Sequence, residues 1–473
     1  MGETYARRLR IISPEELQVE LKEPVDATAL VQARTIVEDV KKNGLSALRT
    51  HAQRLGDIPT IDSKILYSYE ELKPYYDSLP EEQKNVLTRT KDRIEKFALA
   101  QRASISDLHT NITGGGNAGH TIAPMNVAGC YAPGGRYPLP SSVLMTAVTA
   151  RAAGVPTVFV ASPRPSPVTL AAAYVAKADY LLALGGAQAI AALAYGTLTE
   201  EVQNLVAPKQ DNDSNIENSM NSNSNKSPSN LNCICDIIVG PGNKWVTAAK
   251  SLVQGICAID MLAGPSEVLV IADKEGGTGH EAVIASDLLA QAEHDTEARP
   301  ILVCTDDTLI NTINDQVYEQ LCSLPTASTA FEACAKGFIV KVNSIEEAIN
   351  ISDQIAPEHL EIQVGPDLES SRKAAFQCQN YGAVFIGHNA AEVLGDYGAG
   401  PNHVLPTGGT AKYTGGLSVF TFLKIRTYLM IENLMESQEV VEDSVCLARL
   451  EGLEGHARAA EKRIINPHKK QKI

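Results

Sequence analysis

The sequence lacks an uninterrupted apolar run long enough to cross a membrane, which takes about 18 residues or more. Its longest apolar-looking region, Val143 to Ser162, is interrupted by Arg151 and Pro156. The opening residues, MGETYARRLR, lack the apolar core of a signal peptide. We therefore expect no membrane partner and a cytoplasmic location, with a plastid reached by a removed transit peptide as the alternative.

Positive charge and paired cysteines are also scarce. Lys plus Arg number 41 against 56 Asp plus Glu, and the resulting net charge of −15 repels phosphate backbones, so we expect no nucleic-acid partner. The nine cysteines include no C-x-x-C pair, which fits a reducing compartment better than a disulfide framework. What is present is ordinary for a folded globular protein, with 44% hydrophobic and 21% charged residues. A chain of 473 residues predicts two large domains with smaller attachments.

Short β-rich apolar runs alternate with helix-like segments along most of the chain. Thr157 to Ala161 and Val268 to Ala272 are typical strands, whereas Ser141 to Ala153 and Glu281 to Glu293 repeat apolar residues at helical spacing. This alternation predicts two α/β units with parallel sheets. The composition changes at residues 211–232, where eight Asn and six Ser occupy 22 positions. Such a segment cannot bury enough apolar area to offset its ordering entropy, so we expect a disordered surface insertion.

The segment LLAQAEHD places Gln291 and His294 three residues apart, so on a helix both side chains point to one side. An imidazole with an amide or carboxylate oxygen suits zinc, but two ligands do not make a site, and a surface histidine is the alternative. In APEHL, Glu358 and His359 stand side by side before a predicted strand. An acid beside an imidazole could divide proton transfers between them, although the dipeptide alone is weak evidence.

A Gly/Pro-rich loop, GDYGAGPNHVLPTGG, contains Asp396 and His403, where the carboxylate could serve a site or only a turn. His456 and Glu451 lie near a polar C-terminal helix, where a solvated surface role is the alternative.

Three glycine clusters could approach a cofactor, and they begin near Tyr131, near Gly185 and near Val239. Gln188 falls on the first turn of the helix predicted in the second cluster. The spacing G-x-G-x-x-G is absent, because Trp245 stands where the third glycine would be, so a standard dinucleotide fingerprint cannot be claimed.

Taken in order, these segments resemble the L-histidinol dehydrogenase family. The matching motifs are YAPGGRYPLPSSVLM, GGAQAIAALA, GPGNKWVTAAK, DMLAGPSEVLVIAD, ASDLLAQAEHD, APEHLEI, GDYGAGPNHVLPT and EGLEGHA. The main departure is the Asn/Ser-rich insertion, which falls between the Gln188 and Asn243 motifs.

The resemblance implies roles for individual residues. The expected zinc ligands are Gln291, His294, Asp396 and His456, the last from the partner subunit of a homodimer with shared active sites. Glu358 and His359 are the expected catalytic proton-transfer pair, and Tyr131, Gln188 and Asn243 the expected NAD contacts. The substrate, L-histidinol, is expected to contact Ser266, Gln291, His294, His359, Asp396, His403, Glu451 and His456.

The resemblance also implies a domain plan with two incomplete Rossmann-like domains in an intertwined homodimer. We expect an N-terminal arm at 1–27, a first domain with the zinc-site core at 28–120 and 267–405, a second, NAD-binding domain at 121–266, and a C-terminal helical tail at 406–473.

The implied reaction oxidises L-histidinol through L-histidinal to L-histidine with two NAD. His359 is expected to take the hydroxyl proton in the first step, and Glu358 to activate water in the second. A cysteine nucleophile at Cys130 is a rival for the aldehyde step, although no neighbouring His or Lys would lower its pKa. A zinc hydrolase and a metal-stabilised binding protein are alternatives of other classes, but the sequence lacks H-E-x-x-H, and neither alternative explains the glycine clusters.

Overall fold

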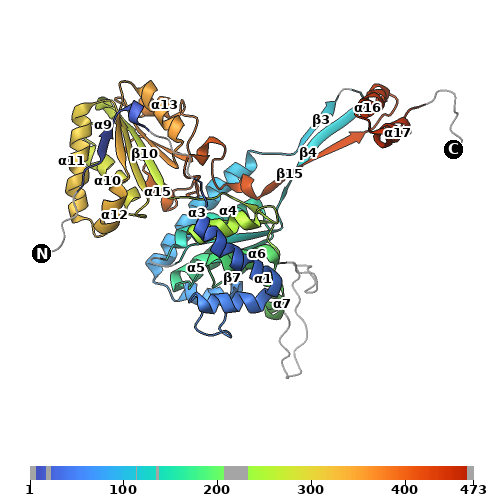
Figure 1. Cartoon of the computed structure of the whole chain (residues 1–473), viewed down its shortest axis with the longest axis horizontal. Coiled ribbons are helices and arrows are strands. Elements are labelled where there is room, and N and C mark those ends of the chain that lie inside the picture. The colour runs from blue at the N-terminus through green and yellow to red at the C-terminus, as the bar shows by residue number, and fades with distance from the viewer. Residues whose placement is uncertain (1–6, 18–22, 113, 135–137, 207–232, 466–473) are drawn as a thin grey trace. The chain divides into compact units, whose positions relative to one another are not determined.

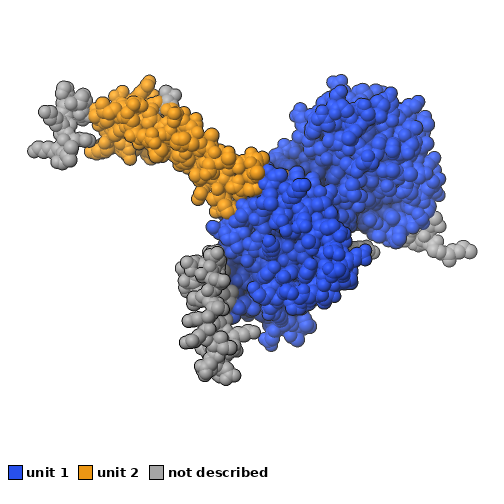
Figure 2. Space-filling view, turned by 180° about the vertical axis from the view of Figure 1, so that it is seen from behind, with its two compact units in different colours: residues 1–100, 125–422 blue, residues 101–124, 423–473 orange. Residues whose placement is uncertain are grey.

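The structure, a computed structural model, describes residues 7–17, 23–112, 114–134, 138–206 and 233–465. The expected disordered insertion at 211–232 lies outside these residues. The chain divides into two compact units (Figure 2): unit 1 comprises Met1–Ala100 and Met125–Phe422, and unit 2 comprises Gln101–Pro124 and Leu423–Ile473. In the described part of the chain no helix is long and apolar enough to span a bilayer.

Unit 1 contains a six-stranded sheet, sheet A, in the order β1-β12-β11-β10-β13-β14 with every pair parallel. Its strands are β1 (Arg10–Ile12), β10 (Glu267–Ala272), β11 (Arg299–Cys304), β12 (Phe338–Lys341), β13 (His359–Gln363) and β14 (Ala383–Ile386). Helices α10 (Glu281–Ala292), α11 (Asp307–Ser323) and α12 (Ala327–Cys334) form one core with the sheet, and α13 (Ile345–Ile355) and α14 (Leu368–Ala375) form another. The central strands are apolar because both faces are covered (Figure 1).

A second six-stranded sheet in unit 1, sheet B, has the order β2-β7-β6-β5-β8-β9. Its strands are β2 (Leu66–Ser68), β5 (Val127–Tyr131), β6 (Thr157–Ala161), β7 (Tyr180–Leu182), β8 (Ile237–Val239) and β9 (Ala258–Ile259). Only β2 runs antiparallel to its neighbour. Helices α1 (Ala27–Arg54), α6 (Gly186–Tyr195) and α8 (Lys244–Val253) share one core with this sheet, and α4 (Pro140–Ala153) packs on α5 (Pro167–Val175), β5 and β6.

The two sheets have the same topology. Without the edge strands β1 and β2, sheet A reads β12-β11-β10-β13-β14 and sheet B reads β7-β6-β5-β8-β9, so each has the relative order 3-2-1-4-5. This is the strand order of a Rossmann unit without its sixth strand, and the order reverses between β10 and β13 and between β5 and β8. The prediction of two incomplete Rossmann-like parallel α/β units is confirmed.

The expected assignment of residues 28–120 to the zinc-site domain is wrong for residues 28–77, and residues 101–120 belong to unit 2. Strand β2 pairs with β7, α1 packs on α6 and α8, and α2 (Tyr69–Asp77) packs on α5, so these elements belong with sheet B. The sequence pattern of an amphipathic helix indicates that one face is apolar, but it does not indicate which sheet that face packs against. The expected arm at 1–27 supplies β1, an edge strand of sheet A.

Unit 2 is built on a three-stranded antiparallel sheet in the order β15-β4-β3. Its elements are β3 (Leu108–Ile112), β4 (Gly116–Pro124), β15 (Leu423–Ile431), α16 (Gln438–Leu450) and α17 (Glu454–Glu461). The prediction of a helical tail at 406–473 is therefore wrong for residues 423–431, which form a strand. Polar and apolar residues partly alternate in this segment, as is typical of a strand. The remaining helices of the chain are α3 (Glu81–Ala103), α7 (Thr199–Val206), α9 (Lys274–Gly277) and α15 (Glu392–Asp396).

Candidate active site

Three of the predicted site residues lie at the carboxyl edge of sheet B. Tyr131 is the last residue of β5, Gln188 lies on the first turn of α6, which follows β7, and Asn243 caps α8, which follows β8. Parallel strands place their carboxyl ends at one edge, and the crevice beside the reversal of strand order is where such sheets bind ligands. The Tyr131 hydroxyl accepts a hydrogen bond from the Gly186 backbone N–H at 3.1 Å, which joins the end of β5 to the start of α6.

The amide of Gln188 is oriented by a residue that the sequence analysis did not single out. Asp57 Oδ2 accepts hydrogen bonds from Gln188 Nε2 at 2.9 Å and from the Gly185 backbone N–H at 3.0 Å. With Nε2 engaged, Gln188 Oε1 is buried and finds no hydrogen-bond partner among the described residues. A buried unpaired acceptor is costly, so this atom suits a hydrogen-bond donor on a bound molecule.

The Gly-Pro-Gly turn after β8 is fixed by a buried ion pair. Gly240 has a φ of 110°, and a Cβ there would lie 2.0 Å from the Tyr131 carbonyl oxygen, so only glycine fits against β5. Lys250 donates to the Gly240 carbonyl at 3.0 Å and pairs with Asp260, which in turn accepts from the Gly240 N–H at 2.7 Å. Asn243 Oδ1 accepts from two backbone N–H groups at the start of α8, each at 3.2 Å.

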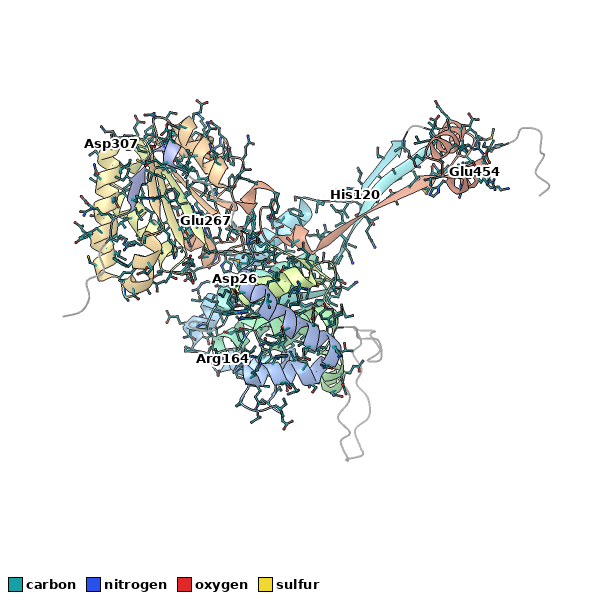
Figure 3. The ribbon with its side chains drawn as sticks, viewed as in Figure 1. Asp26, His120, Arg164, Glu267, Asp307 and Glu454 are labelled. Atoms are coloured by element: carbon teal, nitrogen blue, oxygen red, sulfur yellow. The ribbon has the colours of Figure 1, made fainter. Side chains whose placement is uncertain are left out.

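The other predicted site residues of unit 1 gather at the amino edge of sheet A. His359 is the first residue of β13, and Glu267, labelled in Figure 3, is the first residue of β10. Helix α10 connects two parallel strands, so its carboxyl end returns to the edge where β11 begins, and it brings Gln291 and His294 with it. Asp396 ends α15 at the same edge.

At this edge the side chains approach within a few ångströms. His359 Nδ1 lies 3.2 Å from Gln291 Oε1, and its Nε2 lies 3.8 Å from Asp396 Oδ1. His294 Nε2 lies 3.7 Å from Asp396 Oδ2. Ligand atoms of His294, Asp396 and Glu392 all lie within 4.8 Å of one another. Glu392 was not among the predicted site residues. It lies four residues before Asp396, so on a helix the two side chains point to the same side.

This set of groups fits a divalent cation. Within the described part of the chain, three buried atoms of the cluster have no hydrogen-bond partner: Gln291 Nε2, His359 Nε2 and Glu392 Oε2. Imidazole nitrogen with amide and carboxylate oxygen is a donor set that zinc accepts. The described residues thus offer ligand atoms of suitable kinds in one place.

Burial shifts the pKa values of the candidate proton-transfer residues. It lowers the pKa of His359 to about 4, so this imidazole is neutral at physiological pH. Burial also raises the pKa of Glu358 well above its usual value, and the neighbouring Glu267 carboxyl adds to the increase. The backbone N–H of Glu267 donates to Glu358 Oε2 at 3.1 Å, which fixes this carboxyl at the start of β13.

Ser266 and His403 also lie in this cluster. Ser266 is a side-chain hydrogen-bond partner of Glu358, and His403 Nδ1 donates to the Asp396 carbonyl at 2.9 Å. Burial lowers the pKa of His403, so it too is neutral near pH 7. Glu451 and His456 belong to unit 2, at the end of α16 and in α17, and both are exposed. Their predicted roles remain predictions.

At the carboxyl edge of sheet A, the described residues pack closely where the strand order reverses. Asp273, which follows β10, accepts hydrogen bonds from the backbone N–H groups of Gly276 and Gly365. A Cβ at Gly276 would lie 2.3 Å from the Gln363 carbonyl oxygen, so the chain itself fills the place where strand order reverses.

Cys130 has little nucleophilic character in this setting. It lies inside β5, is fully buried, and burial raises the pKa of its thiol to about 12. The thiolate is the reactive form, so a thiol with this pKa is a poor candidate for covalent catalysis.

Comparisons with known proteins identify the family of this chain. The family model described as histidinol dehydrogenase matches residues 21–209 and 233–464. The chain belongs to the histidinol dehydrogenase family. The family match is interrupted at residues 210–232, which nearly coincide with the Asn/Ser-rich insertion.

Individual members of the histidinol dehydrogenase family match over almost their whole length. The chain is 39% identical over 441 residues to the enzyme of Thermus thermophilus, covering 93% of this chain and 95% of that one. It is 37% identical over 435 residues to the enzyme of Methanococcus maripaludis, covering 91% and 92%. The crystal structure of histidinol dehydrogenase from Elizabethkingia anophelis has a TM-score of 0.81 and 29% identity, covering 96% and 98%.

Proposed function

We propose that this protein oxidises L-histidinol through L-histidinal to L-histidine with two NAD, as a four-electron oxidoreductase of histidine biosynthesis. The observation that carries the proposal is the convergence of Gln291, His294, His359 and Asp396 at one edge of sheet A, in a member of the histidinol dehydrogenase family. The overall reaction consumes one water and releases two NADH and three protons.

Zinc is proposed as the resident metal. Gln291, His294 and Asp396 would hold it, together with His456 of the partner subunit. When bound, zinc serves as a template and Lewis acid for an amino alcohol that also carries an imidazole. Glu392 stands close enough to His294 and Asp396 to offer a further carboxyl oxygen to the site.

NAD is proposed to bind at the carboxyl edge of sheet B. Tyr131, Gln188 and Asn243 would contact it, and the unpaired Gln188 Oε1 offers it an acceptor. The cofactor supplies the hydride acceptor for each oxidation.

His359 is proposed to take the proton from the substrate hydroxyl. Both acceptors beside its Nδ1, Gln291 Oε1 and the Glu267 carbonyl, require the hydrogen on Nδ1, so the lone pair is on Nε2. Burial keeps this imidazole neutral at pH 7, and Nε2 has no hydrogen-bond partner among the residues that the structure describes. A neutral, oriented lone pair is what a general base needs.

Glu358 is proposed to take a proton from water during oxidation of the aldehyde. Its Oε2 is held by the Glu267 N–H, and the Ser266 side chain is a further hydrogen-bond partner of this carboxyl group. Its raised pKa makes the ionised carboxylate a stronger base than an exposed glutamate. Ser266 and His403 would line the substrate site beside these two groups, and Glu451 would complete the lining.

A homodimer with shared sites is proposed because unit 2 buries little of its own apolar surface. Ile425 and Leu429 on β15 are 56% and 65% exposed, and Leu447 and Leu450 on α16 are 59% and 80% exposed. Exposed apolar surface of this kind suits a protein interface. A second copy would cover it while bringing His456 of the partner subunit to the metal.

The direct test is NADH absorbance on mixing the protein with NAD and L-histidinol. We expect two NADH per L-histidinol, loss of the signal with a chelator, and its return with Zn²⁺. Zinc binding without any NADH would overturn the proposal in favour of a hydrolase or a binding protein.

A further inference from the structure

The buried face of β13 that follows His359 is polar. Residues alternate along a strand, so His359, Glu361 and Gln363 share one face, and all are buried. The register with β10 places three apolar residues beside them on the same face: Val268, Val270 and Ala272. A polar stripe therefore enters an otherwise apolar layer between sheet A and α10.

The opposing helix contributes an acid to this stripe. Asp287 lies on α10, one helical turn before Gln291, and its side chain is hydrogen-bonded to Glu361. Asp287 is 8% exposed and Glu361 is fully buried. Two carboxyl groups can form such a bond only when they share a proton. Burial raises the pKa of Asp287 to about 6 and that of Glu361 to about 8, which supports a shared proton near neutral pH.

A third element is tied to the same carboxyl group. The backbone N–H of Glu392, at the start of α15, donates to Glu361 Oε1 at 2.9 Å. Asp396 follows four residues later on the same short helix. Glu361 thus links α10, β13 and α15. Each of these elements carries a site residue close to the link: Gln291 on α10, His359 on β13 and Asp396 on α15.

At the end of the polar stripe that is farther from the site, Gln363 and His388 form the remaining hydrogen bonds. Gln363 Nε2 donates to Glu361 Oε2 at 3.4 Å, and Gln363 Oε1 accepts from His388 Nδ1 at 2.7 Å. The ring of His388 stacks on His280 at a centroid distance of 3.5 Å. No cation among the described residues forms an ion pair with Asp287 or Glu361.

We propose that Glu361, through its side-chain contact with Asp287 and its bond to the Glu392 N–H, is a positioning residue that sets the spacing of Gln291, His359 and Asp396. The inference deepens the proposed function, because it assigns the support behind the zinc ligands. A network of this kind orients ligands, and its loss commonly costs about 10–100-fold in metal affinity.

Two substitutions at one position test the idea. Glu361→Gln keeps a donor for Asp287 and an acceptor for the Glu392 N–H, whereas Glu361→Met keeps the volume and removes both. Competition with a chromogenic chelator should give a zinc Kd close to wild type for Glu361→Gln and about 10–100-fold weaker for Glu361→Met. Ser352→Ala is the control, because Ser352 is a buried polar residue of α13 on the other face of sheet A, and this variant should bind zinc nearly as wild type does.

Amide hydrogen exchange on the metal-free full chain gives a second readout that needs neither zinc nor activity. Glu361→Met should increase exchange at the ends of α10 and in α15 while leaving α13, on the other face of sheet A, protected. Wild-type zinc affinity and unchanged exchange in Glu361→Met would overturn the inference. If the wild type binds no zinc, the metal part of the proposed function fails, and the exchange pattern alone decides the positioning role.

Discussion

The imidazole of His359 faces the carboxylate of Asp396 with its unprotonated nitrogen, at 3.8 Å from Nε2 to Oδ1. Its other nitrogen is 3.2 Å from Gln291 Oε1, which requires the hydrogen there. A lone pair opposite a carboxylate is unfavourable unless a cation or a proton enters between them. The geometry therefore suits a site in which Asp396 binds a metal ion and His359 Nε2 accepts a proton from the substrate.

Replacing His359 by Asn should remove the base while leaving an amide that can donate to Gln291. We expect the rate of L-histidinol oxidation to fall by about 10²–10⁴, the usual contribution of a positioned general base, while zinc content stays unchanged. Single-turnover NADH formation and metal analysis measure the two quantities. His120→Asn, in unit 2 (Figure 3), is the control. If the rate of L-histidinol oxidation is unchanged in His359→Asn, His359 is not the base of the first step.

Glu358→Gln should act on the other half-reaction. The amide keeps an acceptor for the Glu267 N–H but cannot take a proton from water. We therefore expect oxidation of added L-histidinal to slow much more than oxidation of L-histidinol to the aldehyde. Parallel rate measurements with the two substrates test this. Equal slowing of both steps would show that Glu358 has no special part in the second.

The buried carboxyl of Glu361 should make stability depend on pH in a direction opposite to that of an ordinary ion-paired acid. Its pKa rises from 4.5 to about 8 on folding, so the native state binds more protons than the unfolded chain between these values. The stabilisation is complete below 4.5 and is lost as pH rises through about 8. Denaturant unfolding of metal-free protein should show a steeper loss of unfolding free energy with rising pH in wild type than in Glu361→Gln. A steeper loss in the variant would contradict the assignment.

The sequence predicts the parts of the site that follow from local rules. The spacing of three residues predicts that Gln291 and His294 point to one side at the end of a helix. The glycines at 240 and 242 predict the turn after β8. The association of Asp57 with Gln188 could not be foreseen, because 131 residues separate the two and no periodicity relates them. The acids of the polar stripe were equally hidden. Glu361 sits in LEIQV, where an alternating strand would normally point its polar residues to solvent, and only burial of both sheet faces turns it into a core residue.

Asp57 should matter for NAD more than for L-histidinol. Asp57→Ala removes the acceptor that orients Gln188 and that engages the Gly185 N–H, so the amide becomes free to rotate. Hydrogen bonds to charged groups contribute about 1.5–3 kcal/mol, and on this basis we expect KM for NAD to rise about 10-fold or more with little change in KM for L-histidinol. Asp57→Asn retains an acceptor oxygen and should show a smaller effect. Equal increases in both KM values would indicate general damage to the fold.

Sharing of the site between two chains can be tested with inactive partners. His294→Ala and His456→Ala chains should each be inactive as homodimers. In a hybrid dimer of the two, one site carries both substitutions and the other carries neither, so the second site is intact. Half of the dimers in an equal mixture are hybrids, and activity should return to about a quarter of the wild-type value. Mixing His294→Ala with Asp396→Ala chains is the control, because both residues lie in unit 1 and every site in that mixture lacks one ligand. If native mass spectrometry detects hybrid dimers but the first mixture stays inactive, His456 serves its own chain or has no part in the site.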